Sequence, residues 1–315
     1  MFLGFHATVV GGFIVAPRLA QLDWAADAFG PAVRMLQEAH RVEGKLLAVV
    51  GGSGLVFLLG LLDDKLGARF PVAAKAAGEL AAAIVLVAAG VEISLFPWPW
   101  LNSIVTLVWI VGITNAFNLL DNMDGLAAGV ACAASLVLLI NAVMLGEFFI
   151  ALILAAFIGA LLGFLAYNFH PASVFLGDCG SLFIGYLIAS LTLLERYVSH
   201  ASSTLFPVLM PVVVLAIPLL DTATVIVIRL REHRPIYVGD TRHLSHRLVS
   251  MGFSTRAAVL FLYLATFTLG LGAASLTDAT PGQAAMILLQ TAGIVALLVI
   301  LLFLERRRQP RDVAP

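Results

Sequence analysis

Long runs of apolar residues follow one another along most of the chain, separated by short polar or Gly/Pro-rich breaks. A helix needs about 20 mostly apolar residues to cross the hydrocarbon core of a bilayer. Ten runs approach that length, and they lie near residues 2–16, 44–62, 73–95, 101–120, 125–146, 148–167, 181–195, 204–230, 256–276 and 284–304. The alternation that is typical of a β-barrel does not accompany them. The pattern predicts an all-α, polytopic integral membrane protein with about ten transmembrane helices.

Composition supports this class and excludes several others. Of the 315 residues, 61% are hydrophobic and 12% are charged, whereas soluble domains average about 45–50% and about 25%. A formal net charge of −1 gives no reason to expect a nucleic-acid partner. Two cysteines are too few for a disulfide scaffold. Because no linker divides the chain, we expect residues 1–315 to form a single transmembrane domain.

Lysines and arginines are distributed unequally between the two sides of the predicted bundle. With ten alternating spans, one side of the membrane holds the connections after the even-numbered runs and the C-terminal tail. Thirteen of the lysines and arginines fall on that side, and five fall on the other side. The positive-inside bias puts the first side in the cytoplasm. The sequence therefore predicts a multi-pass protein of the inner (plasma) membrane.

Acidic residues recur on that same side, where the even-numbered runs end. They are Asp63, Asp64, Asp121, Asp124, Asp178 and Asp240. The intervals from 64 to 121, 124 to 178 and 178 to 240 are 57, 54 and 62 residues, about two crossings each, so the chain returns to one face every time. A single acid at a helix end is usually only solvated, but polar groups at membrane depth are costly unless they are satisfied. The recurrence predicts one site at the cytoplasmic ends of the helices.

Two features suggest the chemistry of this site. Clustered carboxylates favour Mg²⁺, with Mn²⁺ as the alternative, and proteins often hold Mg²⁺ with one or two carboxylates together with substrate phosphates. Asp178 lies between Gly177 and Gly180 just before a predicted helix, and such a helix start presents backbone N–H groups to an anion. Cys179 has nothing nearby that would activate its thiol, so we interpret it as a small packing residue.

The most basic connection contains Arg242, His243, His246 and Arg247. The i, i+3 spacing of the two histidines is compatible with zinc, but no cysteine or further histidine accompanies them. A cluster that faces phosphate fits these residue types better, and a solvated basic loop is the plain alternative.

Two further polar features lie within the apolar runs themselves. Lys75 and Glu79 form an i, i+4 pair for which a salt bridge is the default interpretation, and Lys75 is also a candidate ligand for an anionic substrate. Asp221 lies inside the eighth run, where we expect Thr222, Thr224 or a neighbouring helix to satisfy it. We assign Asp221 no chemistry from the sequence alone.

Taken in order, the polar segments resemble the polyprenyl-phosphate N-acetylhexosamine-1-phosphate transferases, a family that includes phospho-N-acetylmuramoyl-pentapeptide transferase. The similar segments are Gly60–Asp64, Asn115–Gly125, Asn168–Asp178, Pro218–Asp221 and Asp240–Arg247. The resemblance implies a Mg²⁺-dependent catalytic domain in which a polyprenyl phosphate attacks the sugar-linked phosphorus of a UDP-N-acetyl amino sugar. UMP is then the leaving group.

The resemblance also implies roles for individual positions. It assigns Asn118 and Asp178 to the metal, and Asp63 and Asp64 to the lipid phosphate or its deprotonation. A phosphate monoester is already largely ionised at neutral pH, so an orienting role for the two acids is an equal expectation. The full set of expected catalytic residues is Asp63, Asp64, Asp121, Asp124, His243 and His246.

The remaining positions are expected to bind substrate. Asn168 and Phe175 match positions that line the sugar and uracil site, and the histidine loop is expected to contact the diphosphate. The expected substrate-binding residues are Lys75, Asn168, Phe175, Arg242 and Arg247. Asn122 and Ser245 depart from the family pattern, and Ser245 puts a catalytic role of the middle position of the histidine loop in doubt. The resemblance leads us to expect one further span upstream of the runs found here.

Two alternatives remain beside the main prediction. The His-x-x-His-Arg-Leu loop and the basic tail favour donors of the UDP-N-acetylglucosamine type and the first membrane step of cell-envelope glycan synthesis, over phospho-N-acetylmuramoyl-pentapeptide transferase. A proton-coupled transporter is the rival from another class, because Glu79, Glu92 and Asp221 are intramembrane acids. Transporters place such sites near the midplane between inverted repeats, whereas here the polar clusters lie at one face. A homodimer is left open.

Overall fold

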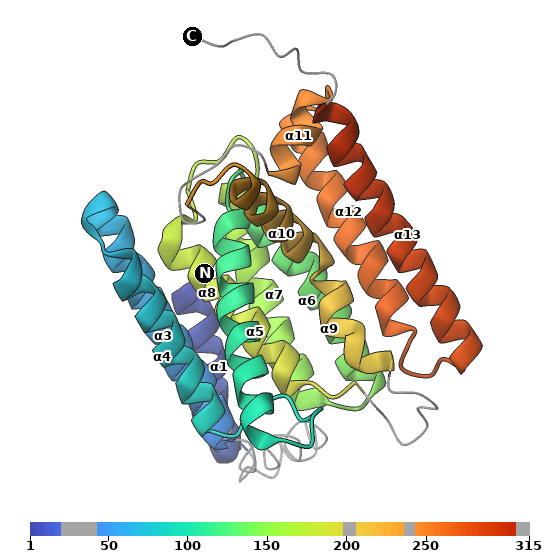
Figure 1. The fold of residues 1–315 in the computed structure, drawn as a ribbon. Coiled ribbons are helices and arrows are strands. Elements are labelled where there is room, and N and C mark those ends of the chain that lie inside the picture. The colour runs from blue at the N-terminus through green and yellow to red at the C-terminus, as the bar shows by residue number, and fades with distance from the viewer. Residues whose placement is uncertain (20–42, 198–205, 236–242, 307–315) are drawn as a thin grey trace. The chain divides into compact units, whose positions relative to one another are not determined.

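The computed structural model describes all residues except 20–42, 198–205, 236–242 and 307–315 (Figure 1). Throughout the part that it describes, the regular elements are helices and no strand occurs, which confirms the all-α prediction. The chain divides into two compact units, Met1–Arg196 and Tyr197–Pro315, and each is considered by itself. The expectation of one transmembrane domain stays a prediction.

The first unit is a bundle whose innermost helix is α8. Its elements are α1 (Phe2–Leu19), α3 (Glu43–Leu66), η2 (Gly67–Arg69), α4 (Val72–Ala88), α5 (Pro99–Leu120), α6 (Leu126–Met144), α7 (Phe148–Asn168) and α8 (Gly177–Leu194). Helix α8 packs against α3 and α5, and every residue from Gly180 to Thr192 is buried. A helix that is apolar on all sides belongs in such a central place.

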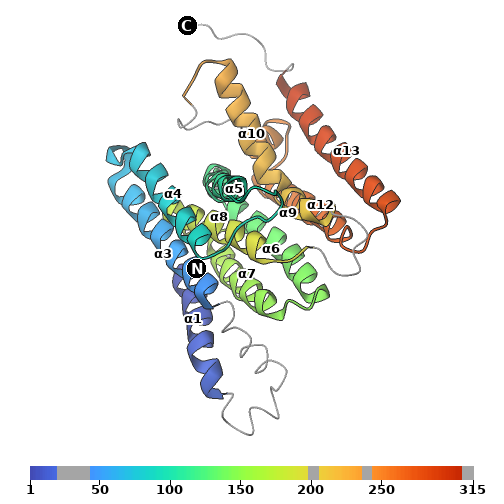
Figure 2. The ribbon, with the colours of Figure 1, turned by 60° about the horizontal axis from the view of Figure 1, so that its bottom comes forward.

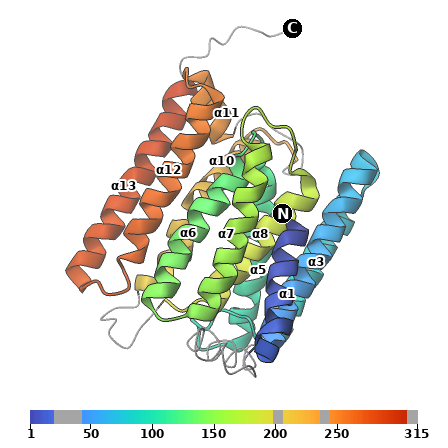
Figure 3. The same ribbon diagram turned by 180° about the vertical axis from the view of Figure 1, so that it is seen from behind.

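Other helices enclose this central element. Helix α6 packs against α7, and both contact α8 (Figure 3). Helix α4 contacts α3 and α5, and α3 and α4 run side by side in the view of Figure 2. Because consecutive helices of this unit alternate in direction, the C-terminal ends of α3, α5 and α7 meet the N-terminal ends of α4, α6 and α8. These helix ends and their connections carry most of the residues predicted for the site in this unit, namely Asp63, Asp64, Lys75, Asn118, Asp121, Asp124, Asn168 and Asp178.

The number of spans is smaller than predicted. Within the described ranges, seven helices are long and apolar enough to cross a membrane, and an eighth is obtained if one bent pair is counted as a span. The prediction of about ten is therefore not confirmed. Helix α4 has 17 residues and spans about 25 Å at 1.5 Å per residue, less than the roughly 30 Å hydrocarbon core. The apolar part of α1, Phe2–Ile14, is also short.

The second unit corrects the predicted eighth span. Its elements are η3 (Phe206–Leu209), α9 (Met210–Val214), α10 (Ala216–Arg231), α11 (Leu244–Ser250), α12 (Thr255–Ala274) and α13 (Pro281–Arg306). The run that we expected as one helix over 204–230 is bent by 67° between α9 and α10. Pro218 lacks an N–H for the carbonyl of Val214, and its ring would clash with that carbonyl in a continuous helix. The helix therefore breaks between them.

Candidate active site

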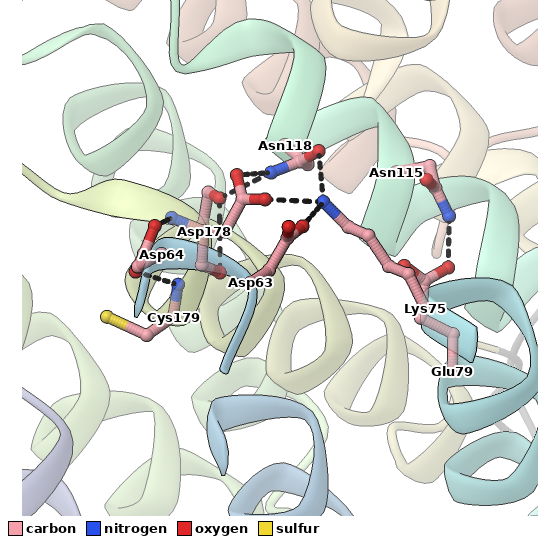
Figure 4. A network of polar contacts seen from close by, with 9 residues as sticks. Asp63, Asp64, Lys75, Glu79, Asn115, Asn118, Asp178 and Cys179 are labelled. Carbon is pink, nitrogen blue, oxygen red and sulfur yellow. Dashed lines mark hydrogen bonds and ion pairs between the residues drawn. The ribbon is translucent and has the colours of Figure 1, made fainter. Parts of the chain in front are cut away.

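Lys75, in the first turn of α4, is the centre of an ionic cluster (Figure 4). Its Nζ lies 2.9 Å from Asp63 Oδ2 and 2.6 Å from Asp178 Oδ2, and it donates to Asn118 Oδ1 at 3.3 Å. These partners come from the ends of α3, α8 and α5, and they use all three donors of the ammonium group. The default interpretation of Lys75 and Glu79 as a salt bridge is therefore wrong. Three partners distant in sequence hold the lysine instead.

Asn118 and Asp178, the two residues that the resemblance assigns to a metal, contact each other directly. Asn118 Nδ2 donates to Asp178 Oδ1 at 2.7 Å and to Ser181 Oγ at 2.9 Å. Carboxylate and amide oxygens are suitable ligands for Mg²⁺. Among the described residues, however, no group of three or more His, Cys, Asp or Glu side chains is arranged to hold a metal. The donor set fits an ion that shares its coordination with substrate phosphates and does not fit an all-protein cage.

Asp63 and Asp64 are neighbours in sequence but make different contacts. Asp63 pairs with Lys75, whereas Asp64 binds the start of α8. Asp64 Oδ1 accepts from the backbone N–H of Asp178 at 2.8 Å, and Oδ2 accepts from that of Cys179 at 3.0 Å. A carboxylate there satisfies two N–H groups that lack partners within the helix, and it complements the positive end of the helix dipole. The two acids therefore have separate tasks.

Two glycines allow this close approach of α3 to α8. A Cβ on Gly60 would lie 2.5 Å from the carbonyl carbon of Asp178, so a larger residue would push the helices apart. Gly177 has φ of +65°, and a Cβ there would lie 2.8 Å from Asp64 Oδ2. Residues with a side chain rarely adopt that backbone conformation. The glycines thus let Asp64 reach the N–H groups of α8.

A cavity of about 270 Å³ lies in the same unit. It is lined by Asp121, Asn122, Met123, Asp124, Asn168, Phe175 and Leu176. Phe175 is 76% exposed, so a ligand in the cavity can reach this residue. Burial, together with the negative charges of Asp178, Asp124 and Asp64, raises the pKa of Asp121 to about 7. The cavity is therefore close enough to the Lys75 cluster for their charges to interact.

Asn168 lines the cavity, but protein groups occupy its amide. Its Oδ1 accepts from the backbone N–H of Gly125 at 3.0 Å, and its Nδ2 donates to the carbonyl of Val174 at 2.9 Å. The residue is only 3% exposed. Asn168 thus fixes the α5–α6 and α7–α8 connections around the cavity, and direct contact with substrate stays a prediction.

In the second unit, His243 and Asp221 form a buried pair. His243 Nδ1 lies 2.7 Å from Asp221 Oδ2, and the backbone N–H of Leu244 donates to Asp221 Oδ1 at 2.6 Å. Of the three expected partners of Asp221, the neighbouring helix is therefore confirmed, because His243, the N-cap of α11, and Leu244, its first residue, satisfy the two oxygens. The Pro218–Asp221 segment was recognised in the sequence, but the contact of Asp221 with the predicted catalytic residue His243 was not.

The rest of the histidine loop is only partly described. The rings of His243 and His246 are 6.4 Å apart between centroids, and burial, followed by the charge of His243, lowers the pKa of His246. Arg247 is half-buried in α11, whereas Asp240 and Arg242 lie outside the described residues. The convergence of this loop with the cluster of the first unit stays a prediction.

Within the first unit, the prediction that the acidic segments meet at one end is confirmed. Asp63, Lys75, Asn118 and Asp178 touch one another at the ends of their helices (Figure 4). A transporter would place such a cluster near the middle of its helices. The arrangement can instead hold anionic groups at the edge of the bundle, beside the cavity that Asp121, Asp124 and Phe175 line.

Comparison with known proteins agrees with this geometry. Residues 46–195, which carry the Lys75 cluster and the cavity, match the family model described as glycosyl transferase family 4. The chain is 36% identical over 275 residues to a probable undecaprenyl-phosphate N-acetylglucosaminyl 1-phosphate transferase of Bacillus subtilis, with 84% of this chain and 75% of the relative covered. It is 38% identical over 287 residues to a decaprenyl-phosphate N-acetylglucosaminephosphotransferase of Mycolicibacterium smegmatis, with 82% and 70% covered.

Relatives with another name match a smaller part of the chain. Phospho-N-acetylmuramoyl-pentapeptide-transferase of Desulforamulus reducens is 30% identical over 232 residues, which cover 58% of this chain and 69% of the relative.

Proposed function

The chain belongs to glycosyl transferase family 4, and from this premise we propose that it transfers N-acetylglucosamine 1-phosphate from its UDP-sugar to a membrane polyprenyl phosphate and releases UMP. The relatives named for this type of transfer match more than four fifths of the chain. The match to the pentapeptide transferase covers 58% of it, which favours the N-acetylglucosamine donor. The observation that carries the proposal is the contact of Lys75 with Asp63 and Asp178.

The reaction brings two anionic phosphates together, so its main cost is electrostatic. In the proposal, Asp178 and Asn118 would hold Mg²⁺, with Mn²⁺ as a substitute, and such an ion would supply positive charge to offset that of the phosphates. Lys75 contributes a permanent positive charge beside these ligands. The basic residues of the second unit, His243, His246, Arg242 and Arg247, are proposed to contact the diphosphate.

The lipid phosphate is proposed to approach Asp63. Its second pKa is about 6, so most of it is ionised at neutral pH and needs little help to lose a proton. Asp63 already contacts Lys75 at 2.9 Å. We assign Asp63 to orienting the phosphate through this lysine and to accepting the residual proton, while Asp64 stabilises the start of α8.

The donor is proposed to bind with its uncharged parts in the cavity. The exposed ring of Phe175 offers a face on which a nucleobase can stack, while the carboxylates of Asp121 and Asp124 would repel phosphate groups. The diphosphate would therefore lie toward Lys75. With the positive-inside bias of the sequence, we place this site at the cytoplasmic face of the inner (plasma) membrane.

Membranes that contain the full chain test the proposal. They are incubated with undecaprenyl phosphate, Mg²⁺ and either UDP-N-acetylglucosamine or UDP-N-acetylmuramoyl-pentapeptide, and UMP is measured. We expect UMP from the first donor only, above the level of membranes without the protein. Faster release from the pentapeptide donor would favour the peptidoglycan reaction, and no release from either donor would contradict phosphoglycosyl transfer.

A further inference from the structure

A histidine without an assigned role contacts one of the cavity acids. His170 lies two residues after the end of α7. The Nδ1 atom of His170 is 2.9 Å from Asp124 Oδ2. The backbone N–H of Ala172 donates to the same oxygen at 3.1 Å. Among the described residues, both donors to this carboxylate reach Oδ2. Oδ1 is therefore the oxygen left for a ligand in the cavity that Asp124 lines.

The chemistry of the contact fixes the tautomer of the ring. An ionised carboxylate can only accept hydrogen bonds, so the hydrogen must be on Nδ1 of His170. The ring and the Ala172 N–H together restrict rotation of the Asp124 carboxylate about its χ2 angle. A carboxylate whose orientation is fixed in advance loses less conformational freedom when it binds a ligand.

The position of the pair in the fold points to the cavity. Asp124 belongs to the α5–α6 connection and His170 to the α7–α8 connection, and Asn168 joins the same two connections through the N–H of Gly125. The side chains of His170 and Asp124 are 40% and 25% exposed. A side-chain contact with this much exposure adds little to the stability of a fold. We therefore explain the pair by its effect on the Asp124 carboxylate, which it holds in one orientation at the cavity wall.

We propose that His170 is a positioning residue for the donor site, where it holds the Asp124 carboxylate so that Oδ1 accepts a hydrogen bond from the UDP-sugar. The group recognised is an N–H or O–H of the nucleoside or the sugar, because a carboxylate repels phosphate. The inference rests on the proposed function. It extends that function because it identifies a residue that strengthens binding of the UDP-sugar without touching a reacting atom.

The effect of losing His170 is specific to one substrate. Without the ring, Asp124 keeps its charge and the Ala172 contact but can turn Oδ1 away from the cavity. The donor then loses part of one hydrogen bond to a charged group. Because the lipid phosphate and the metal ligands lie at the Lys75 cluster, the lipid KM and the Mg²⁺ requirement do not depend on this contact.

Three variants of the full chain test the inference in detergent with undecaprenyl phosphate. His170→Ala removes the donor, and His170→Asn keeps an N–H group close to the position of Nδ1. Ser173→Ala is the matched control, since Ser173 lies in the same connection and its hydroxyl donates to the Tyr167 carbonyl. The donor KM, lipid KM and kcat are measured for each, together with the melting temperature.

We expect His170→Ala to raise the donor KM by about 5- to 20-fold, the size of a partly exposed hydrogen bond to a charged group. Its lipid KM and kcat should stay within about twofold of the wild type. His170→Asn should restore most of the donor affinity, and Ser173→Ala should behave as the wild type. An unchanged donor KM in His170→Ala would overturn the inference, and so would a rise in both KM values that asparagine does not rescue.

Direct binding separates this inference from the proposed function. Titration of purified protein with UDP-N-acetylglucosamine, without the lipid, should give a Kd that rises by the same factor in His170→Ala. A wild type that turns over the donor while both proteins bind it equally would leave the proposed function standing and overturn the role of His170. A wild type that neither binds nor turns over this donor would overturn both.

Discussion

Lys75 Nζ lies 2.6 Å from Asp178 Oδ2, although 103 positions separate the two residues in the sequence. The contact ties the start of α4 to the start of α8 at the place where the resemblance puts the metal. It puts a fixed positive charge between Asp63 and Asp178. One ammonium offsets only one of the two carboxylates in contact with it, and the other is the charge that the proposed metal site requires.

Asp178→Asn should reduce transfer by about 10²-fold or more, the usual cost of removing one charged group that stabilises a transition state. The amide keeps the shape but gives up the charge that contacts Lys75 and that we propose to bind Mg²⁺. The measurement is kcat as a function of Mg²⁺ concentration. Asp278→Asn, an exposed position in the second unit, is the control. Near-normal turnover of Asp178→Asn at limiting Mg²⁺ would rule out the metal role.

Asp63 and Asp64 should respond differently to substitution. Asp64→Ala removes the side chain that binds two N–H groups of α8, and loss of such a cap costs about 0.5–2 kcal/mol of stability. Asp63→Ala removes one partner of Lys75 and should lower kcat with a smaller effect on the melting temperature. Thermal unfolding and kcat are compared for the two variants. Equal effects on both quantities would contradict the division of tasks.

Glu79 and Asn115 form a buried contact one helical turn behind Lys75 and Asn118 (Figure 4). Glu79 is 3% exposed, and its Oε1 has no partner in the described part of the chain. Glu79→Gln keeps an oxygen that can accept from Asn115, whereas Glu79→Ala leaves the Asn115 amide without that acceptor. Asn115 Nδ2 keeps its bond to the Val111 carbonyl at 3.0 Å, so Glu79→Ala costs one hydrogen bond, which is worth about 0.5–1.5 kcal/mol. We therefore expect a lower melting temperature for Glu79→Ala than for Glu79→Gln, and equal values would contradict this.

Glu195 makes stability depend on pH. It is 5% exposed, and burial, opposed by a hydrogen bond from Asn141 and assisted by Glu147, raises its pKa from 4.5 to about 8. The folded state therefore binds a proton more tightly than the unfolded state. The contribution to stability is complete below about pH 4.5 and is lost as the pH rises through 8.

Glu195→Gln removes this titration without changing the shape of the side chain. The difference in melting temperature between the variant and the wild type should grow in favour of the variant as the pH rises from 5 to 9. A difference that stays constant over this range would show that Glu195 does not titrate there.

The meeting of Asp63, Asn118 and Asp178 could be predicted from the sequence, because helices of similar length return the chain to one face. The partners of Lys75 could not. The i, i+4 rule finds only neighbours on one helix, whereas the groups that hold Lys75 come from three other helices. The different contacts of Asp63 and Asp64 depend on how α3 is rotated about its axis. Pro218 does predict a break in the eighth span, but the apolar content of the run, from which the span was predicted, does not show it.

His170 illustrates the same limit. The motif that contains His170 is visible in the sequence. The contact of His170 with Asp124, however, exists only because the α7–α8 connection folds back over Asp124. Only the three-dimensional contact distinguishes it from a solvated loop histidine. Asn168 is the converse case, because its position beside the cavity was expected while the backbone groups that occupy its amide were not.

A donor labelled in two places tests the central claim most directly. UDP-N-acetylglucosamine carrying ³²P in the β-phosphate and ¹⁴C in the sugar is incubated with the purified full chain, undecaprenyl phosphate and Mg²⁺. We expect both labels to enter the lipid fraction in equal molar amounts, with UMP as the released nucleotide and with both signals lost in Asp178→Asn. Sugar label alone in the lipid, with UDP released, would show transfer of the sugar without its phosphate and would contradict the account.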